Sequence, residues 1–305
     1  MNWKVQKLVK IIIPVIIFSF LGWQVFRDWS LVSRYFEAIK FHYLLFSLPI
    51  FLLIYPEGAL CWWMVLQRMG IKIPLLVAIR IWIIANTSRY IPGKIWQYLG
   101  RGELAKREAG IARGKTIFSL FLEIFLVITA AGLVSILALP VIGFQNINKG
   151  FIIFLLPLSL IFLHPKFSNF ILFLIAKFSR NRINVSFPLT FGQSLSIFPL
   201  YILNFLINGL ALYFIVVSIY SNNITTNFYH ILTFSGFYAF SWVVGFLSFF
   251  APGGLGVTEI TLSYLLSFLM PLSLASSITI LYRFLLTIAE FLVFGFFLKI
   301  GGKRS

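Results

Sequence analysis

The chain has few charged residues and few of the residues that enzymes use for chemistry. Only 11% of its 305 residues are charged and 60% are hydrophobic, whereas about 25% of the residues in a soluble domain are charged. The single cysteine, Cys61, excludes an intrachain disulfide. The three histidines are isolated and lack the spacing of metal ligands. We therefore expect an integral membrane protein that is not an enzyme and holds no metal or cofactor.

Acidic residues are also scarce, with 8 Asp and Glu against 25 Lys and Arg and a net charge of +17. Such a balance can indicate nucleic-acid binding, but here the basic residues lie in loops beside apolar segments, which is how membrane topology is encoded. Both termini and the segments 94–115 and 164–182 are rich in Lys and Arg, whereas 140–150 and 220–230 hold one Lys together. The sequence thus predicts a multi-pass protein of the cell (cytoplasmic) membrane, with both termini in the cytoplasm and no nucleic-acid partner.

The loop charges make this topology testable. An impermeant thiol reagent applied to intact cells is expected to label a cysteine placed at position 222 and to miss one placed at position 110. The reason is that 101–115 is strongly basic, whereas 220–230 is uncharged. The segment 27–40, which is expected outside although it contains three basic residues, runs against the charge rule. Labelling of position 110 from outside would contradict the topology.

A proline–glycine break interrupts the apolar sequence twice, at Pro92-Gly93 and at Pro252-Gly-Gly-Leu-Gly256. Proline lacks a backbone donor and glycine tolerates unusual dihedral angles, so each motif stops a helix. In hydrocarbon, the unpaired backbone groups of a stopped helix survive only if they are buried in protein or line a wet cavity. Paired breaks in two halves of a chain indicate a transporter-type site near the bilayer midplane. The alternative for each break is a tight turn at the membrane interface.

We expect an all-α polytopic membrane protein with one transmembrane domain, residues 1–305, in two approximate inverted halves, 1–145 and 146–305. Each half would contain two spans, a broken segment and one more span. This gives about six full spans and two re-entrant or discontinuous segments. The expected spans are 11–26, 41–66, 117–139, 151–163 with its flanks, 195–219 and 274–299. The broken segments begin at 75–91 and at 231–250.

Ionisable residues inside apolar segments are costly and are functional candidates by default. They are Glu57, Arg80, Arg89, Lys94, Glu123, Glu259, Arg283 and Glu290. Pro92 and Pro252 are 160 residues apart, as are Glu123 and Arg283. We therefore expect Glu123 and Arg283 to form an ion pair between the halves. Arg80 and Arg89 could instead extend to the membrane interface.

The breaks also suit an anionic ligand, because the start of a helix presents free N–H groups and the positive end of a dipole. Glycines after the second break allow close approach of a ligand, and basic residues near the first add positive charge. A phospholipid or a polyprenyl phosphate would supply the anion, while Glu123 and Glu259 would pair with the cations when lipid is absent, or couple to protons. The predicted lipid-binding residues are Arg89, Pro92, Gly93, Lys94, Arg101, Glu123, Pro252, Gly253, Gly254, Gly256, Glu259 and Arg283.

Four sequence features together resemble the flippase-like transmembrane domain of lysylphosphatidylglycerol synthases. They are Ile91-Pro-Gly-Lys-Ile-Trp-Gln97, Pro252-Gly-Gly-Leu-Gly-Val-Thr-Glu259, Glu123 and Tyr282-Arg283. The resemblance covers essentially the whole chain. With the two breaks, it implies a flippase that moves an anionic phospholipid or a polyprenyl-phosphate-linked sugar between leaflets, with a glycan-assembly or lipid-modifying enzyme as a partner. It does not imply synthase activity, because no segment corresponds to the cytosolic aminoacyl-transfer domain. The alternative is a membrane subunit or scaffold that presents a lipid-linked substrate to a glycan or aminoacyl transferase.

Overall fold

The computed structural model describes residues 19–37, 39–90, 95–136, 166, 189–220, 227–248 and 251–301, and the regular secondary structure in these ranges is helical. The elements are α2 (Trp29–Glu37), α3 (Phe41–Arg68), α4 (Leu75–Asn86), η1 (Thr87–Tyr90), α5 (Trp96–Ala109), α6 (Arg113–Ser135), α9 (Phe191–Tyr220), α10 (Phe228–Leu247), η4 (Pro252–Gly254), α11 (Val257–Leu266) and α12 (Leu272–Gly301). The short elements η1 and η4 are 3₁₀ helices. The predicted all-α fold is confirmed.

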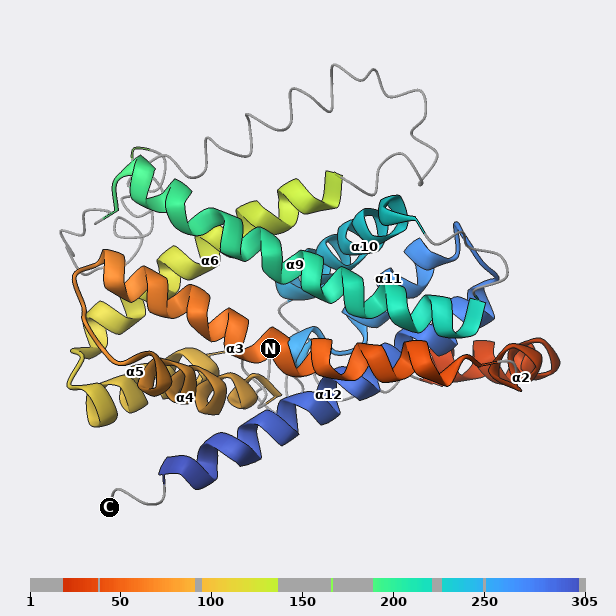
Figure 1. Ribbon diagram of the computed structural model, residues 1–305, viewed down its shortest axis with the longest axis horizontal. Helices are drawn as coiled ribbons and strands as arrows, with labels where there is room; N and C mark the ends of the chain where they lie inside the picture. The colour runs from red at the N-terminus through yellow and green to blue at the C-terminus, as the bar shows by residue number, and fades with distance from the viewer. Residues whose placement is uncertain are drawn as a thin grey trace, which may run out of the picture.

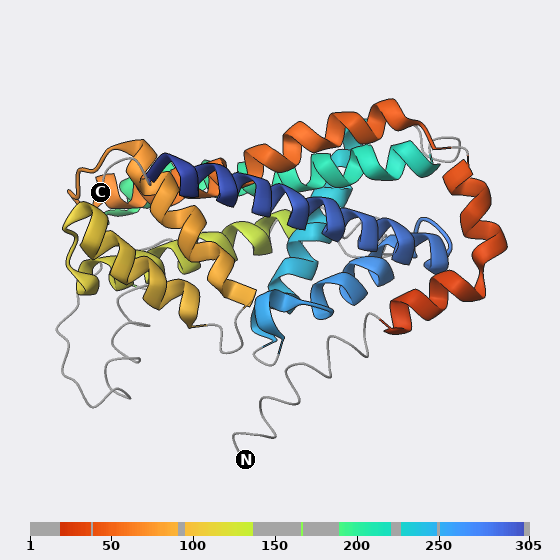
Figure 2. The same ribbon diagram turned by 90° about the horizontal axis from the view of Figure 1, so that it is seen from below.

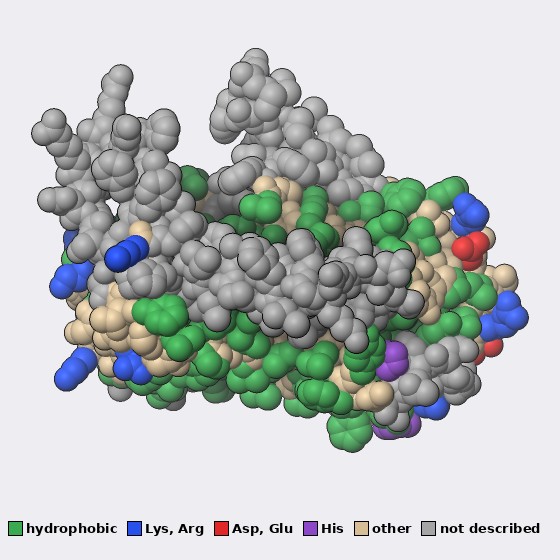
Figure 3. All heavy atoms as spheres, turned by 90° about the horizontal axis from the view of Figure 1, so that it is seen from above, with side chains coloured by type: hydrophobic (Ala, Val, Ile, Leu, Met, Phe, Trp, Pro, Cys, Tyr) green, Lys and Arg blue, Asp and Glu red, His purple; other side chains and the backbone are tan. Residues whose placement is uncertain are grey.

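Five of the described helices, α3, α6, α9, α10 and α12, are long and apolar enough to cross a membrane. Four of them coincide with the expected spans 41–66, 117–139, 195–219 and 274–299. The expected span 151–163 and the first half of 11–26 lie outside the described residues. The long helices run roughly along the long axis of the molecule (Figure 1). On the face in Figure 3, Lys and Arg side chains gather at the two ends of that axis, with hydrophobic side chains between them. This is the pattern of a polytopic membrane protein.

The first broken segment is a re-entrant hairpin. Helix α4 has 12 residues, or about 18 Å of length at 1.5 Å per residue, against about 30 Å of hydrocarbon. It ends in η1, and α5 then packs back along α4. Residues from the beginning of α4 and the end of α5 share one apolar cluster, which includes Ala78 and Ala105. An ion pair of 2.6 Å between Arg80 and Glu108 also joins the two arms. The segment therefore enters and leaves the membrane at the same end of the bundle. Arg80, one of the ionisable residues identified from the sequence, is in the ion pair with Glu108.

The second broken segment is also a hairpin, formed by α10, η4 and α11. In it, α11 packs back against α10 (Figure 1). Its turn depends on glycine, because Gly253, Gly254 and Gly256 have φ angles of 59°, 72° and 84°. A Cβ atom at Gly254 would lie 2.8 Å from Thr258 Oγ1 and 3.3 Å from the Cα atom of Gly245. Gly254 is thus required for the close packing of the hairpin itself, a role that the sequence analysis had not assigned to it.

The tips of the two hairpins meet inside the bundle, where η1 contacts η4. A Cβ atom at Gly253 would lie 3.5 Å from the ring of Tyr90. The ends of the two stopped helices thus pack against each other, as expected where irregular backbone in a membrane needs a protein partner. Long helices surround the tips: α3 packs against α9, α6 against α10, and α12 against α3 and α4.

The two ends of the bundle carry different segments. Helix α5 and the C-terminal end of α12 lie at one end, and α2 lies at the other (Figures 1 and 2). The C-terminal end of α9 is also at the α2 end, since Lys40 N donates to Ser218 O at 2.8 Å and the rings of Tyr35 and Tyr220 are 5.4 Å apart. Residue Tyr220 and the basic helix α5 are thus at opposite ends, as the topology prediction requires.

Candidate functional site

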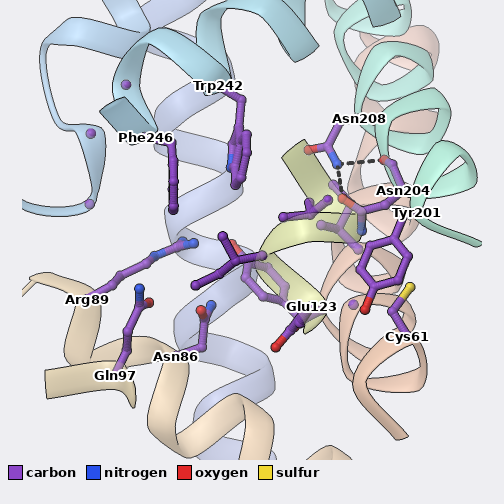
Figure 4. A pocket seen from close by; sticks show the side chains of 18 of the residues that line it. Cys61, Asn86, Arg89, Gln97, Glu123, Tyr201, Asn204, Asn208, Trp242 and Phe246 are labelled. Carbon is purple, nitrogen blue, oxygen red and sulfur yellow. Dashed lines mark hydrogen bonds between the residues drawn. The ribbon is translucent and has the colours of Figure 1, made fainter. Parts of the chain in front are cut away.

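A cavity of about 220 Å³ lies where the hairpin tips meet. It has lining residues from both breaks, with Arg89 from η1 and Gly253 and Gly254 from η4. Its other polar or charged lining residues include Tyr55, Asn86, Gln97, Tyr98, Arg101, Glu123, Tyr201, Asn204, Asn208 and Tyr238. Figure 4 shows Arg89, Asn86 and Gln97 on one side of the cavity and Cys61, Tyr201 and Asn204 on the other. A polar cavity inside an apolar bundle is the principal candidate site.

The first ion pair at the cavity joins Arg101 of α5 to Glu123 of α6. The guanidinium carbon of Arg101 lies 5.2 Å from the ring centroid of Trp62 and 5.4 Å from that of Trp82. Trp82 Nε1 also donates to Glu123 Oε1 at 3.0 Å. A cation between two indole rings gains cation–π energy in addition to its ion pair. Arg101 is accordingly buried, with 3% of its surface exposed.

The second ion pair joins the first break to the last helix. Arg89 Nη2 lies 2.5 Å from Glu290 Oε2, and Tyr90 Oη donates to the same oxygen at 2.6 Å. Asn86 Nδ2 and Tyr55 Oη make longer hydrogen bonds to this carboxylate, at 3.4 and 3.5 Å. Glu290 is 1% exposed and contacts donors from α3, α4 and η1. It therefore fixes the tip of the first hairpin onto α12.

The third ion pair holds the second break. Arg283 Nη1 lies 3.0 Å from Glu259 Oε1, and the Gly256 N–H donates to Glu259 Oε2 at 2.6 Å. The anion at the N-terminus of α11 is thus a carboxylate of the protein, in the position of a capping-box glutamate. A lipid phosphate that bound this N–H group would have to displace Glu259.

The predicted pair between Glu123 and Arg283 is wrong, because each of these residues pairs within its own half. Helix α6 packs against α5, and α12 against α11, so the helix that follows each break supplies the nearest partner. The two pairs have opposite polarity. The long helix carries the acid in the first half (Glu123) and the base in the second (Arg283), with Arg101 and Glu259 as the respective partners.

The structure places the other predicted site residues in three groups. Those that line the cavity are Arg89, Arg101, Glu123, Gly253 and Gly254. Those that are not among its lining residues are Pro252, Gly256, Glu259 and Arg283. Those that lie outside the described residues are Pro92, Gly93 and Lys94.

Sequence reasoning missed the amide side chains of the cavity. Asn208 Nδ2 donates to the backbone oxygen of Asn204 at 2.8 Å, and Tyr282 Oη donates to Asn208 Oδ1 at 2.9 Å. Two asparagines four residues apart lie on one face of a helix. In an apolar span this spacing is a signal that could have found them. Within the described residues, no group of three or more His, Cys, Asp or Glu side chains could hold a metal ion.

Several arginine donors at the centre are buried without a hydrogen-bond partner. They are Nε of Arg89, Nε of Arg101, and Nε and Nη2 of Arg283. Each cation is balanced by one carboxylate, yet it retains N–H groups directed at no acceptor. Buried unsatisfied donors are rare in folded proteins. These N–H groups could donate to an additional anion while the ion pair between each arginine and its carboxylate stays in place.

The comparisons with known proteins agree with this architecture. No curated protein matches the chain. Residues 11–293 match the family described as the lysylphosphatidylglycerol synthase TM region. This range includes both hairpins, the cavity and the three central ion pairs. The chain therefore belongs to the family of the lysylphosphatidylglycerol synthase TM region.

Proposed function

We propose that the protein moves an anionic lipid between the leaflets of the cell membrane, with both termini in the cytoplasm and without covalent chemistry on the lipid. The lipid is a phospholipid or a polyprenyl-phosphate-linked sugar. The observation that supports this function is the cavity between the hairpin tips, which is lined by Arg89 and Arg101. A charged headgroup cannot cross hydrocarbon unless the protein supplies polar partners on the way. A glycan-assembly or lipid-modifying enzyme would supply or use the lipid.

The ion pairs suit a phosphate that binds and leaves. An arginine left unpaired in the bundle would be strongly destabilising, and its carboxylate prevents this when no lipid is bound. An entering phosphate would first accept from the free Nε groups of Arg89 and Arg101, forming charge-assisted hydrogen bonds. It could then share each guanidinium with Glu290 or Glu123. The headgroup is thus exchanged without exposing an unpaired charge.

The two hairpins offer a means of alternating access. They approach the cavity from opposite ends of the bundle, and each carries a break at its tip. Movement of one tip away from the other would open the cavity toward one side of the membrane only. This arrangement resembles the inverted repeats through which transporters expose a central site to each side in turn.

The test compares two double variants that change the same helices. Arg101→Gln with Glu123→Gln removes the cavity pair, whereas Glu103→Gln with Arg113→Gln removes the exposed pair between α5 and α6. In proteoliposomes with acyl-labelled phosphatidylglycerol, the cavity variant is expected to bind and move this lipid about 10- to 100-fold less well. This range corresponds to the loss of about 1.5–3 kcal/mol for a charge-assisted hydrogen bond. Acyl-labelled phosphatidylcholine should be affected less.

The exposed-pair variant should match the wild type in both lipids, because a surface pair contributes about 0–1 kcal/mol. Size-exclusion profiles in detergent check that both variants are folded. If the wild type moves neither lipid, the proposed transport is wrong. The alternative is then a scaffold that presents a lipid-linked substrate to a transferase.

A further inference from the structure

One carboxylate in the bundle is not matched by a cation. All eight acidic residues lie in the described ranges, and six of them form ion pairs with arginine. Of the other two, Glu37 is exposed at the end of α2, and Glu57 is near the middle of the 28-residue helix α3. Glu57 is therefore the carboxylate inside a membrane-spanning helix that has no cationic partner in the described part of the chain.

The partners of Glu57 are neutral groups. Asn204 Nδ2 of α9 donates to its Oε2 atom, and Cys61 Sγ, one turn along α3, donates to Oε1 at 3.2 Å. An ionised carboxylate in an apolar bundle is costly when only neutral donors stabilise it, whereas the protonated acid is not.

The charged groups on the other helices around α3 are already engaged. Helix α6 presents Glu123, which is paired with Arg101, and α12 presents Glu290, which is paired with Arg89. On α4, the ring of Trp82 lies against the α3 backbone at residue 58. Protonation of either of these carboxylates would leave an arginine uncompensated. Protonation of Glu57 leaves no arginine without its carboxylate, because Glu57 has no cationic partner among the described residues.

Glu57 is linked to the cavity through its partners. Both Cys61 and Asn204 line the cavity, and so does Tyr201, on the side opposite Arg89 (Figure 4). Tyr201 is 3% exposed, and its hydroxyl is buried without a hydrogen-bond partner. A hydroxyl in this position can donate to or accept from a water molecule in the cavity. The Glu57 carboxylate is separated from the cavity lining by one hydrogen bond, through Cys61 or Asn204.

We propose that Glu57 binds and releases a proton during each cycle, and that this couples lipid movement to a proton gradient. The Glu57 carboxylate takes a proton from water when the cavity faces one side, forming a neutral acid. It returns the proton to water when the cavity faces the other side, so only O–H bonds form and break. The coupling rests on the proposed lipid transport, whereas the proton site itself does not. This role replaces the sequence-based expectation that Glu123 and Glu259 couple to protons.

The proton site is tested without transport. Infrared difference spectra of the purified protein, recorded between about pH 5 and about pH 9, above the range of about pH 4 in which exposed carboxyl groups titrate, should contain the C=O band of a protonated carboxylic acid. The band should be absent in Glu57→Gln and retained in Glu103→Gln, which makes the same change at an exposed pair. A wild type without the band, or a Glu57→Gln variant that keeps it, would overturn the proposal whether or not lipid moves.

The coupling is tested in proteoliposomes that contain acyl-labelled phosphatidylglycerol. If one proton moves per lipid, a gradient of about one pH unit should shift the steady-state distribution of the lipid between leaflets about tenfold. In Glu57→Gln, the gradient should produce no such shift. A wild type that moves lipid regardless of the gradient overturns the coupling. If the infrared band depends on Glu57 but the wild type moves no lipid, the proton site stands and the proposed transport fails.

Discussion

Replacing Glu290 with glutamine is expected to lower the free energy of unfolding by about 3–5 kcal/mol, the effect of breaking a buried ion pair. Glu290 is 1% exposed and accepts from Arg89 at 2.5 Å and from Tyr90 at 2.6 Å. The glutamine amide can still accept from Tyr90 Oη through its oxygen, but it leaves the arginine charge uncompensated. The measurement is denaturant unfolding in detergent micelles, followed by tryptophan fluorescence.

The double variant with Arg89→Gln and Glu290→Gln should be more stable than Glu290→Gln alone, because it removes the uncompensated charge as well. Glu103→Gln serves as the control, since its pair with Arg113 is exposed and contributes about 0–1 kcal/mol. Equal stability of Glu290→Gln and Glu103→Gln would show that Glu290 does not hold the first hairpin in place.

The second large effect is expected at Glu259, which has two roles that different substitutions separate. Glu259→Gln removes the charge that balances Arg283, at a cost of about 3–5 kcal/mol. A glutamine at this capping-box position can still accept from the Gly256 N–H. Glu259→Ala also loses this backbone hydrogen bond, so it should cost about 0.5–2 kcal/mol more, the usual effect of losing a helix N-cap.

Denaturant unfolding of both variants measures the difference. Adding Arg283→Gln to Glu259→Gln should restore part of the loss, because Arg283 Nη1 is bound to Glu259 at 3.0 Å. Adding Arg283→Gln to Glu123→Gln should instead give the sum of the two single effects, since these residues are not paired. A rescue in the second combination and none in the first would mean that the assigned pairs are incorrect.

The sequence was sufficient to predict the main features of the fold. Apolar length identified four of the long helices, and the proline–glycine motifs identified both breaks. It also predicted that the helix after each break and the following span would carry ionisable residues. These features could be predicted because they depend on local composition, on helix length and on the rarity of charge in hydrocarbon.

The partners of these residues could not be predicted. The 160-residue offset between Glu123 and Arg283 suggested a contact, but residues at matching offsets in two halves of a chain need not touch. Glu290 and Arg89 are 201 residues apart, and no periodic pattern links them. The role of Gly254 was also hidden, because it depends on the distance to Thr258 across the folded hairpin. Contacts of this kind arise only from tertiary packing.

The balanced pairs at the hairpin tips have a consequence for the membrane potential. A unit charge that crosses the whole membrane exchanges about 2.3 kcal/mol per 100 mV with the electric field. The three central arginines, two in the first hairpin and one in the last helix, each lie no more than 3.0 Å from a glutamate. A pair that shifts as a unit carries no net charge, so voltage does almost no work on it. The field would therefore act mainly on the charges that enter and leave the cavity, and an arginine and glutamate that move together add little to that work.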